Sequence, residues 1–195
     1  AQPNAGHAAL AAWARAHPGR MTVVTQNVDD LHQRAGQPDV VRLHGDILGR
    51  QWLDDSACRE RPRCDPAAAL PGPRAGAGGH ADDGDADGDA DEHAAAGPPR
   101  CARCGNLVRP GVVWFGEALP VAALARAEAL AERCDLMLVV GTSGAVWPAA
   151  GLAGRARAAG AQVAIVNPQP SEIDAQAHLV LRGTAAGLLP RLLDG

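Results

Sequence analysis

The sequence predicts an α/β fold in which helices flank a parallel β-sheet. Short apolar runs suited to buried strands alternate with alanine- and leucine-rich segments of helical length. Several of the strand-like runs end in glycine or small polar residues, and ligands bind at the carboxyl ends of strands in such sheets. At 195 residues, the chain is long enough for one ordinary domain, or for one domain with a small insertion.

The N-terminal part predicts helices and strands in alternation. Asn4 is suited to cap a first helix, and Pro18-Gly19 would end it. Gly36 and Pro38 would end a second, shorter helix. The predicted elements are a helix over 4–17, a strand over 21–25, a short helix over 28–35 and a strand over 40–43.

The amino-acid composition of the sequence changes between about Gly49 and Arg100. Pro, Gly, Ala and Asp dominate there, and the hydrophobic periodicity disappears. The stretch over about 71–99 is of low complexity and is expected to be disordered. We interpret 49–104 as a small module that carries this acidic insertion.

Regular patterns return after Cys101. Asp135 to Val140 is a nearly continuous apolar run ending in glycine, which is typical of a central parallel strand. The predicted elements are an extended segment over 107–115, helices over 120–133, 148–159 and 185–193, and strands over 135–140, 162–166 and 177–181.

Composition excludes several classes of function. The net charge is −4, which argues against a nucleic-acid partner held by bulk electrostatics. All 18 basic residues are arginine, so a Walker-type phosphate loop and a Schiff-base mechanism, which both need lysine, are excluded. No secretory signal or apolar run of membrane-spanning length is present, and the five cysteines, an odd number, fit a reducing cytoplasm.

Two successive motifs carry a family resemblance. The segment TQNVDDLHQRAG at 25–36, followed by VVRLHGD at 40–46, closely resembles the sirtuins, the NAD-dependent protein deacylases. Later motifs follow in the family's order: RPGVVWFGE at 109–117, GTS at 141–143 and Asn167. The WFGE form is most similar to the class III deacylases. The resemblance runs from Pro3 almost to the C-terminus, apart from 49–100.

The resemblance implies a domain organisation and an expectation about how active this chain is by itself. It implies a Rossmann-like NAD-binding catalytic domain formed by 1–48 and 105–195, with 49–104 as a zinc-ribbon-like module. A complete sirtuin begins with a strand and a GAGxS-type loop that cradles the NAD pyrophosphate, and nothing similar precedes Pro3. We therefore expect this chain alone to be a weak or inactive enzyme.

The resemblance also implies an activity. An acyl-lysine protein or peptide would transfer its acyl group to the ADP-ribose part of NAD, releasing nicotinamide, as in deacetylases and desuccinylases. His44 would be the general base that deprotonates the ribose, so that its 2′-hydroxyl attacks the bound amidate. Two alternatives stay open: an NAD-dependent protein ADP-ribosyltransferase, and a truncated sirtuin-like binding module without catalysis. Neither a nucleic acid nor a membrane is an expected partner, and the sequence leaves the oligomeric state open.

Three groups of residues carry the implied site. Asn27 and Asp29 join His44 as the catalytic set. The implied cofactor-binding residues are Gln26, Asn27, Val28, Asp29, Gly141, Thr142, Ser143, Asn167, Pro168, Gln169 and Ala185. The implied substrate-binding residues are Val112, Val113, Trp114, Phe115, Gly116 and Glu117, an extended edge that could pair with a peptide main chain.

Some of these residues could have a purely structural role instead of a role in the site. A single histidine at a strand end is often satisfied by the backbone alone. Asn27 and Asp29 are also suited to cap the following short helix. Trp114 and Phe115 could be core residues, because the chain has few aromatic residues available for packing.

The cysteines depart from the family pattern. Sirtuins carry two CxxC pairs that hold zinc, and here only Cys101-Ala102-Arg103-Cys104 has that spacing. Trp52 and Asp55 stand where the first pair is expected, but Cys58 and Cys64 could complete a site, because a flexible loop tolerates irregular spacing. We therefore predict zinc bound by Cys58, Cys64, Cys101 and Cys104. Cys134, before an apolar run, is expected in the core.

The acidic run Asp83–Gly88 resembles the start of an EF-hand calcium loop. Such a loop needs a glutamate at its twelfth position, where Ala94 stands, so a solvated acidic loop is the better interpretation.

Overall fold

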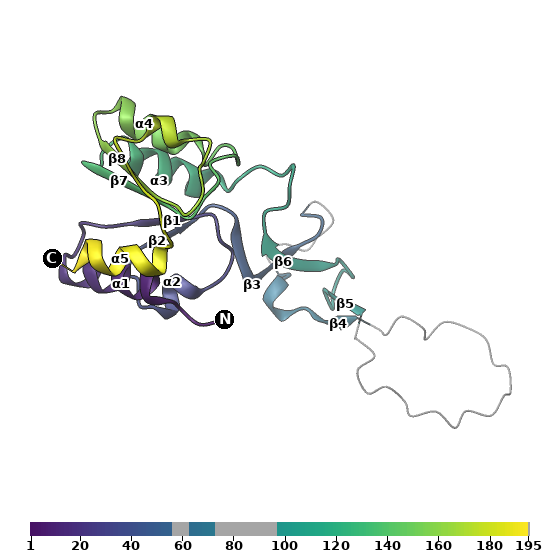
Figure 1. Ribbon diagram of the computed structural model, residues 1–195. Helices are drawn as coiled ribbons and strands as arrows, with labels where there is room; N and C mark the ends of the chain where they lie inside the picture. The colour runs from purple at the N-terminus through teal and green to yellow at the C-terminus, as the bar shows by residue number, and fades with distance from the viewer. Residues whose placement is uncertain (56–62, 73–96, 195) are drawn as a thin grey trace, which may run out of the picture. The chain divides into compact units, whose positions relative to one another are not determined.

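A computed structural model of the chain describes residues 1–55, 63–72 and 97–194 (Figure 1). The chain forms two compact units: a larger one of Ala1–Asp46 with Val112–Gly195, and a smaller one of Ile47–Gly111. Each unit is described separately below.

The first segment of the larger unit follows the predicted alternation. Asn4 caps the first helix, because its side-chain Oδ1 accepts the backbone N–H of Gly6 at 2.9 Å. β1 and β2 are parallel, with Val23 opposite Val40. The elements are α1 (Ala5–Ala16), β1 (Val23–Thr25), α2 (Leu31–Arg34) and β2 (Val40–Arg42).

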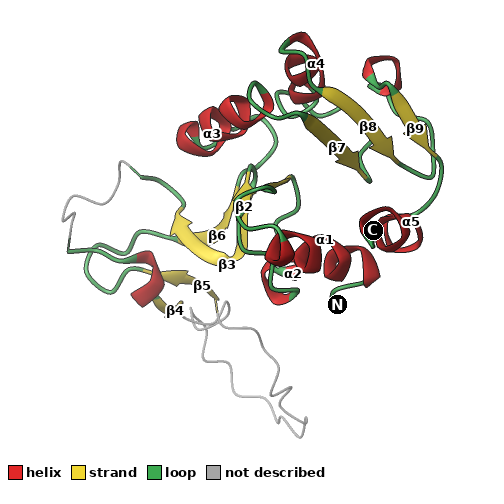
Figure 2. Ribbon diagram, turned by 90° about the vertical axis from the view of Figure 1, so that its left-hand side faces the viewer, coloured by secondary structure: helices red, strands yellow, loops and turns green. Residues whose placement is uncertain are grey.

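The second segment of the larger unit contains a parallel sheet in the order β7-β8-β9 (Figure 2). The elements are α3 (Val121–Ala131), β7 (Leu136–Val140), α4 (Gly151–Ala158), β8 (Gln162–Val166), the 3-10 turn η2 (Asp174–Gln176), β9 (Leu179–Leu181) and α5 (Ala185–Leu193). The sequence predicted β7 as a central strand. This was wrong for the described residues, because β8 lies in the middle, β7 lies at an edge and its Leu136 is 59% exposed.

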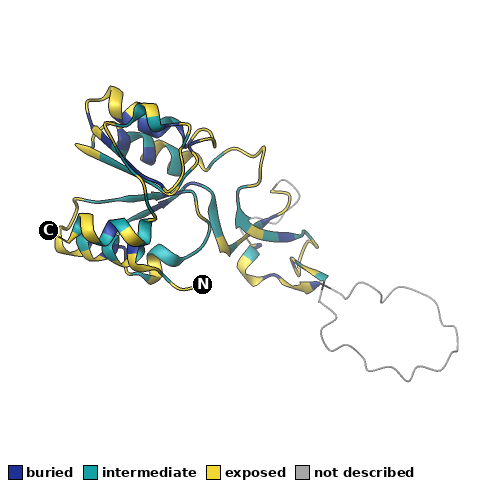
Figure 3. Cartoon of the chain, viewed as in Figure 1, coloured by how far each residue is buried: buried dark blue, intermediate teal, exposed yellow. Residues whose placement is uncertain are grey.

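The core of the larger unit combines residues of both segments. Leu43, which follows β2, and Val163 and Ile165 of β8 are each 1% exposed. They belong to one cluster with Ala127 of α3 and Ala156 of α4, whose small side chains allow close helix packing. Figure 3 colours the buried stretches of the chain dark blue. Burying a large aliphatic side chain contributes roughly 1.5–3 kcal/mol to the stability of the fold. Because β2 and β8 are anchored in this cluster, the polar residues that follow these strands are held in place.

Helices α1 and α5 lie side by side in both ribbon views (Figures 1 and 2). Gly6 makes the approach possible, because a Cβ atom at this position would meet the carbonyl oxygen of Ala185 at 2.9 Å. The first and last helices of the chain are therefore packed together.

The smaller unit is built from short strands. β3 (Gly45–Trp52) pairs with β6 (Val108–Val112), and β4 (Leu70–Gly72) pairs antiparallel with β5 (Gly97–Arg100). The 3-10 turn η1 (Pro66–Ala68) precedes β4. The core of this unit contains Trp52, Cys64, Ala69, Cys101 and Val108.

Two predictions for this region need correction. The loss of periodicity after Gly49 gave no sign of β3, which continues to Trp52. The predicted disorder over 71–99 was wrong at its ends, because 71–72 and 97–99 lie in paired strands. A short strand rich in Pro and Gly lacks the usual alternation, so pairing rather than pattern defines it. The rest of that stretch, with the acidic run at 83–88, lies outside the described residues.

Candidate functional site

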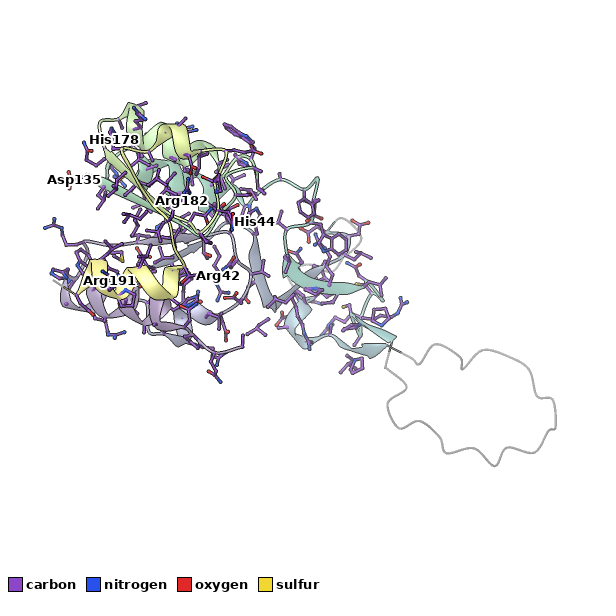
Figure 4. The ribbon with its side chains drawn as sticks, viewed as in Figure 1. Arg42, His44, Asp135, His178, Arg182 and Arg191 are labelled. Carbon is purple, nitrogen blue, oxygen red and sulfur yellow. The ribbon has the colours of Figure 1, made fainter. Side chains whose placement is uncertain are left out.

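The ring of His44 lies just past the carboxyl end of β2 (Figure 4). Its Nδ1 lies 3.0 Å from the main-chain carbonyl oxygen of Gln26. Because a carbonyl oxygen only accepts hydrogen bonds, Nδ1 carries the hydrogen and donates it. In the neutral ring Nε2 is then the basic nitrogen, which is the state that a proton-accepting histidine requires.

A groove of about 790 Å³ in the larger unit contains His44 together with Gln26 and Val28. Residues 112–119 also line this groove, so the structure brings His44 and the predicted peptide edge into one space. The backbone N–H of Val113 donates to the carbonyl oxygen of His44 at 3.0 Å. The two predicted parts of the site are therefore joined through the main chain.

The segment 113–117 forms a tight turn beyond β6. The backbone N–H of Trp114 donates to Glu117 Oε2 at 2.9 Å, and the N–H of Glu117 donates to the carbonyl oxygen of Trp114 at 3.0 Å. Gly116 has a φ of +87°, which a residue with a side chain rarely adopts. The predicted extended conformation to position 115 was therefore wrong after Val112, where the strand ends.

The aromatic side chains of this turn are exposed. Trp114 is 49% exposed and Phe115 is 100% exposed. The interpretation of both residues as core was therefore wrong, and their apolar surface is available to a ligand.

Asn27 and Asp29 follow β1. Asp29 Oδ1 accepts the backbone N–H of Leu31 at 3.0 Å, so its carboxylate supports the start of α2. Asn27 is exposed, and its backbone N–H donates to Thr25 Oγ1 at 3.1 Å. The interpretation of Asp29 as the helix cap was wrong, because the N-cap of α2 is Asp30, which makes no side-chain capping bond, and Asp29 bonds to the first helical residue from one position further back. The side chains that line the groove with His44 belong to the neighbouring Gln26 and Val28.

A second polar cluster joins the ends of β1, β7 and β8. Gln26 Nε2 donates to Thr142 Oγ1 at 3.4 Å. Asn167 is 7% exposed, and its Nδ2 donates to the carbonyl oxygens of Thr142 at 3.1 Å and of Gln169 at 2.9 Å. Gly141 has a φ of +63°, and a Cβ atom added there would meet no other atom within 4 Å, so there is open space beside the turn.

Of the other predicted cofactor residues, Ser143, Pro168 and Gln169 are chain neighbours of this cluster. Ser143 Oγ lies 3.4 Å from the backbone N–H of Ala145, which donates to it, and Pro168 and Gln169 are exposed. Ala185 begins α5 and contributes to its packing on α1. Hydroxyl and amide groups dominate the cluster, and such groups suit the hydroxyls of a ribose, so the donor set fits a dinucleotide.

Arg182 holds this region together, although the sequence analysis did not select it. One nitrogen of its guanidinium donates to the carbonyl oxygen of Gln169 at 2.9 Å, and another pairs with the carboxylate of Asp174. Arg182 and the Ser171 hydroxyl lower the pKa of Asp174 to about 2. The position of Arg182 directly after the strand predicted over 177–181 was the sequence feature that could have indicated this role.

The smaller unit contains a cysteine cluster. The Sγ atoms of Cys64, Cys101 and Cys104 lie within 4.8 Å of one another. Hydrogen bonds from the backbone N–H groups of Cys104 and Arg103 lower the pKa of the Cys101 thiol to about 7. Clustered thiols with stabilised thiolate forms suit zinc, so three predicted ligands fit a tetrahedral site. Cys58, the predicted fourth ligand, lies outside the described residues.

Several groove residues were missed in the sequence. Val146, Trp147 and Pro148 line the groove from the loop before α4, and Val121, Leu124, Ala125 and Glu128 line it from α3. Trp147 is 72% exposed. The position of Trp147 shortly after the GTS motif was the only local sequence feature that could have indicated this part of the groove.

Comparisons with known proteins agree with this arrangement. Residues 1–148 match the model of the Sir2 family. The chain is 48% identical over 194 residues to an NAD-dependent protein deacylase of Ralstonia nicotianae; the match covers 98% of this chain and 65% of that relative. The chain thus spans about two thirds of the length of this relative.

Solved structures of Sir2 proteins are also similar to this chain. A structure described as Sir2 bound to acetylated peptide superposes with a TM-score of 0.76 at 28% identity, covering 99% of this chain and 70% of that one. A Sir2 homologue in complex with NAD superposes with a TM-score of 0.73 at 32% identity, covering 99% of this chain and 64% of that one. With the matched family model and these relatives, the chain belongs to the Sir2 family.

Proposed function

We propose that this chain carries the catalytic site of an NAD-dependent protein-lysine deacylase. The observation that carries the proposal is the groove in which His44 lies beside Gln26 and the turn at 112–117. The names of relatives support it, because the Ralstonia nicotianae protein is an NAD-dependent protein deacylase. Related structures are also described with NAD and with an acetylated peptide.

The residues of the groove would divide the work. NAD would supply a ribose that loses nicotinamide and receives the acyl group. His44 would accept a proton at Nε2, while the Gln26 carbonyl oxygen keeps the ring in the required tautomer. Asn27 and Asp29 would contribute to the nicotinamide side, and Asp29 would also hold the start of α2.

The remaining polar residues would hold the two ligands. Thr142, Ser143 and Asn167 would bind the adenosine half of the dinucleotide, with Gly141 allowing close approach of its backbone. The end of β6 at Val112 and the turn at 113–117 would bind the main chain of the acyl peptide. The exposed Trp114 and Phe115 would shield the acyl-lysine side chain from water.

The units would then have separate roles. The larger unit would be the NAD-binding catalytic domain, and the smaller unit would be a structural module that holds zinc through Cys64, Cys101 and Cys104, with Cys58 as the fourth ligand. Among the described residues, no helix has the length and apolar character needed to cross a membrane. A cytoplasmic location is part of this proposal, because an odd number of cysteines, five in this sequence, suits a reducing compartment.

A combined assay tests this proposal. The protein is incubated with an acetyl-lysine peptide and NAD labelled in its adenosine part, and the products are separated. Release of nicotinamide with appearance of labelled O-acyl-ADP-ribose supports deacylation. Label attached to protein instead would identify an ADP-ribosyltransferase, and peptide binding without any product would identify a binding module.

A further inference from the structure

The groove beside His44 extends well beyond the predicted peptide edge. It continues along α3, past Leu124 and Ala125, to Trp147 in the loop before α4. A smaller hollow of about 370 Å³ adjoins it and shares Glu128, Trp147 and Pro148 with it. Removing an acyl group at His44 does not by itself require this second region.

Trp147 forms an apolar platform at the junction. Its side chain is 72% exposed, although its ring rests on α4, since a Cβ atom at Gly151 would lie 2.8 Å from Trp147 Cζ3. Val121, at the start of α3, is 82% exposed and lines the same groove. An aromatic face supported from below and open above suits an apolar side chain of a ligand.

The far end of this region is acidic. Glu128 of α3, which lines the groove, and Glu132, the residue that follows α3, share the guanidinium of Arg155, whose nitrogens lie 2.9 Å and 2.8 Å from one Oε1 of each carboxylate. Two carboxylates against one guanidinium leave a net charge of −1. The carboxylate of Glu128, which lines both the groove and the hollow, is suited to accept a hydrogen bond from a cationic ligand group.

We propose that Trp147 and the Glu128–Glu132–Arg155 cluster select the residues that flank the acyl-lysine: an apolar side chain on Trp147 and a basic side chain at the cluster. This inference rests on the proposed function, because the same groove contains both His44 and Trp147. An extended peptide held at 112–117 continues along a groove of this kind, and the surplus negative charge favours arginine or lysine over glutamate.

Peptide binding tests the proposal without any need for turnover. Dissociation constants are measured by fluorescence anisotropy for labelled acetyl-lysine peptides, in which each of the three residues on either side is replaced by Ser, Leu, Arg or Glu. The same peptides without the acetyl group report acyl-dependent binding. We expect one flank to prefer Leu over Ser about fivefold, and a position further out to prefer Arg over Glu about threefold.

Variants assign each preference to its residue. Trp147→Ala should reduce the preference for Leu to less than about twofold, whereas Trp147→Leu should keep part of it. Glu128→Gln should weaken the preference for Arg, and Arg155→Gln should strengthen it, because the two changes shift the local charge in opposite directions. Leu136→Ala, which changes an exposed apolar residue outside the groove, serves as the control and should leave every ratio unchanged.

The outcomes separate this inference from the proposed function. Acyl-dependent binding that is equally strong for all flanks, or preferences that persist in Trp147→Ala and Glu128→Gln, would overturn the flank selection alone. Absence of any acyl-dependent binding by the protein would overturn both.

Discussion

The Nδ1 atom of His44 lies 3.0 Å from the main-chain carbonyl oxygen of Gln26, and this contact sets the chemistry of the ring. The acceptor is a backbone atom, so side-chain changes at position 26 leave it in place. The hydrogen on Nδ1 is thereby fixed, and Nε2 remains the nitrogen that takes up a proton.

Replacing His44 tests its role as the base. We expect His44→Ala to lower kcat of the enzyme by about 100-fold or more, because a positioned general base contributes about that much. The melting temperature should change little, since the side chain is only half-buried. His17→Ala, at the exposed end of α1, is the matched control and should retain normal turnover. Near-normal activity of His44→Ala would remove His44 from the mechanism.

Asn167 links two strand ends and should therefore affect stability as well as binding. Asn167→Ala removes two hydrogen bonds from a buried side chain. We expect the free energy of unfolding to fall by about 1–3 kcal/mol, with weaker NAD binding, as measured by urea denaturation and calorimetry. Gln169→Ala keeps the carbonyl oxygen that Asn167 uses, and its unfolding free energy should stay within about 0.5 kcal/mol of the original. Equal losses in both variants would contradict this account.

The cysteine cluster predicts a selective loss of metal. Cys101→Ser removes a buried thiol that lies within 4.8 Å of two others, so zinc content should fall well below one ion per chain. Cys134→Ser changes a thiol outside the cluster, whose Sγ donates to the Ala131 carbonyl oxygen, and should keep its zinc. Elemental analysis after purification measures both variants. Equal zinc content in the two would mean that these three cysteines do not hold the metal.

His32 predicts a pH dependence of stability. Burial of the ring, followed by the nearby His7, lowers the pKa of His32 below its usual 6.5, while the Asp29 carboxylate acts in the opposite direction. The unfolded chain therefore binds more protons than the folded chain in the range just below pH 6.5. The stability contributed by the neutral ring is fully present above pH 6.5 and falls as the pH drops towards the folded pKa.

Denaturation at several pH values tests this dependence. The unfolding free energy of the original chain should decrease between about pH 7.5 and about pH 5.5, and His32→Asn should reduce the size of that decrease. His17→Asn is the control, because its ring is exposed. An identical pH profile of the unfolding free energy for the original chain and for His32→Asn would exclude His32 as the source of the pH dependence.

The order of elements was largely readable from the sequence. The cap at Asn4, the apolar runs of β1, β2 and β8, and the limits of α5 follow from local chemistry, and the structure agrees. β3, β4 and β5 were missed, because their pairing depends on partners far away in the chain, and β4 and β5 also contain Pro and Gly residues that give no periodic pattern.

The sequence by itself determined the family and the chemical types of the site residues, because both are properties of short motifs such as TQNVDDLH and LHG. Only the tertiary structure decided that Trp114 and Phe115 are exposed and that Trp147 and Glu128 share a groove with His44. Exposure and proximity depend on packing between residues about 100 positions apart, for which spacing along the chain carries no information.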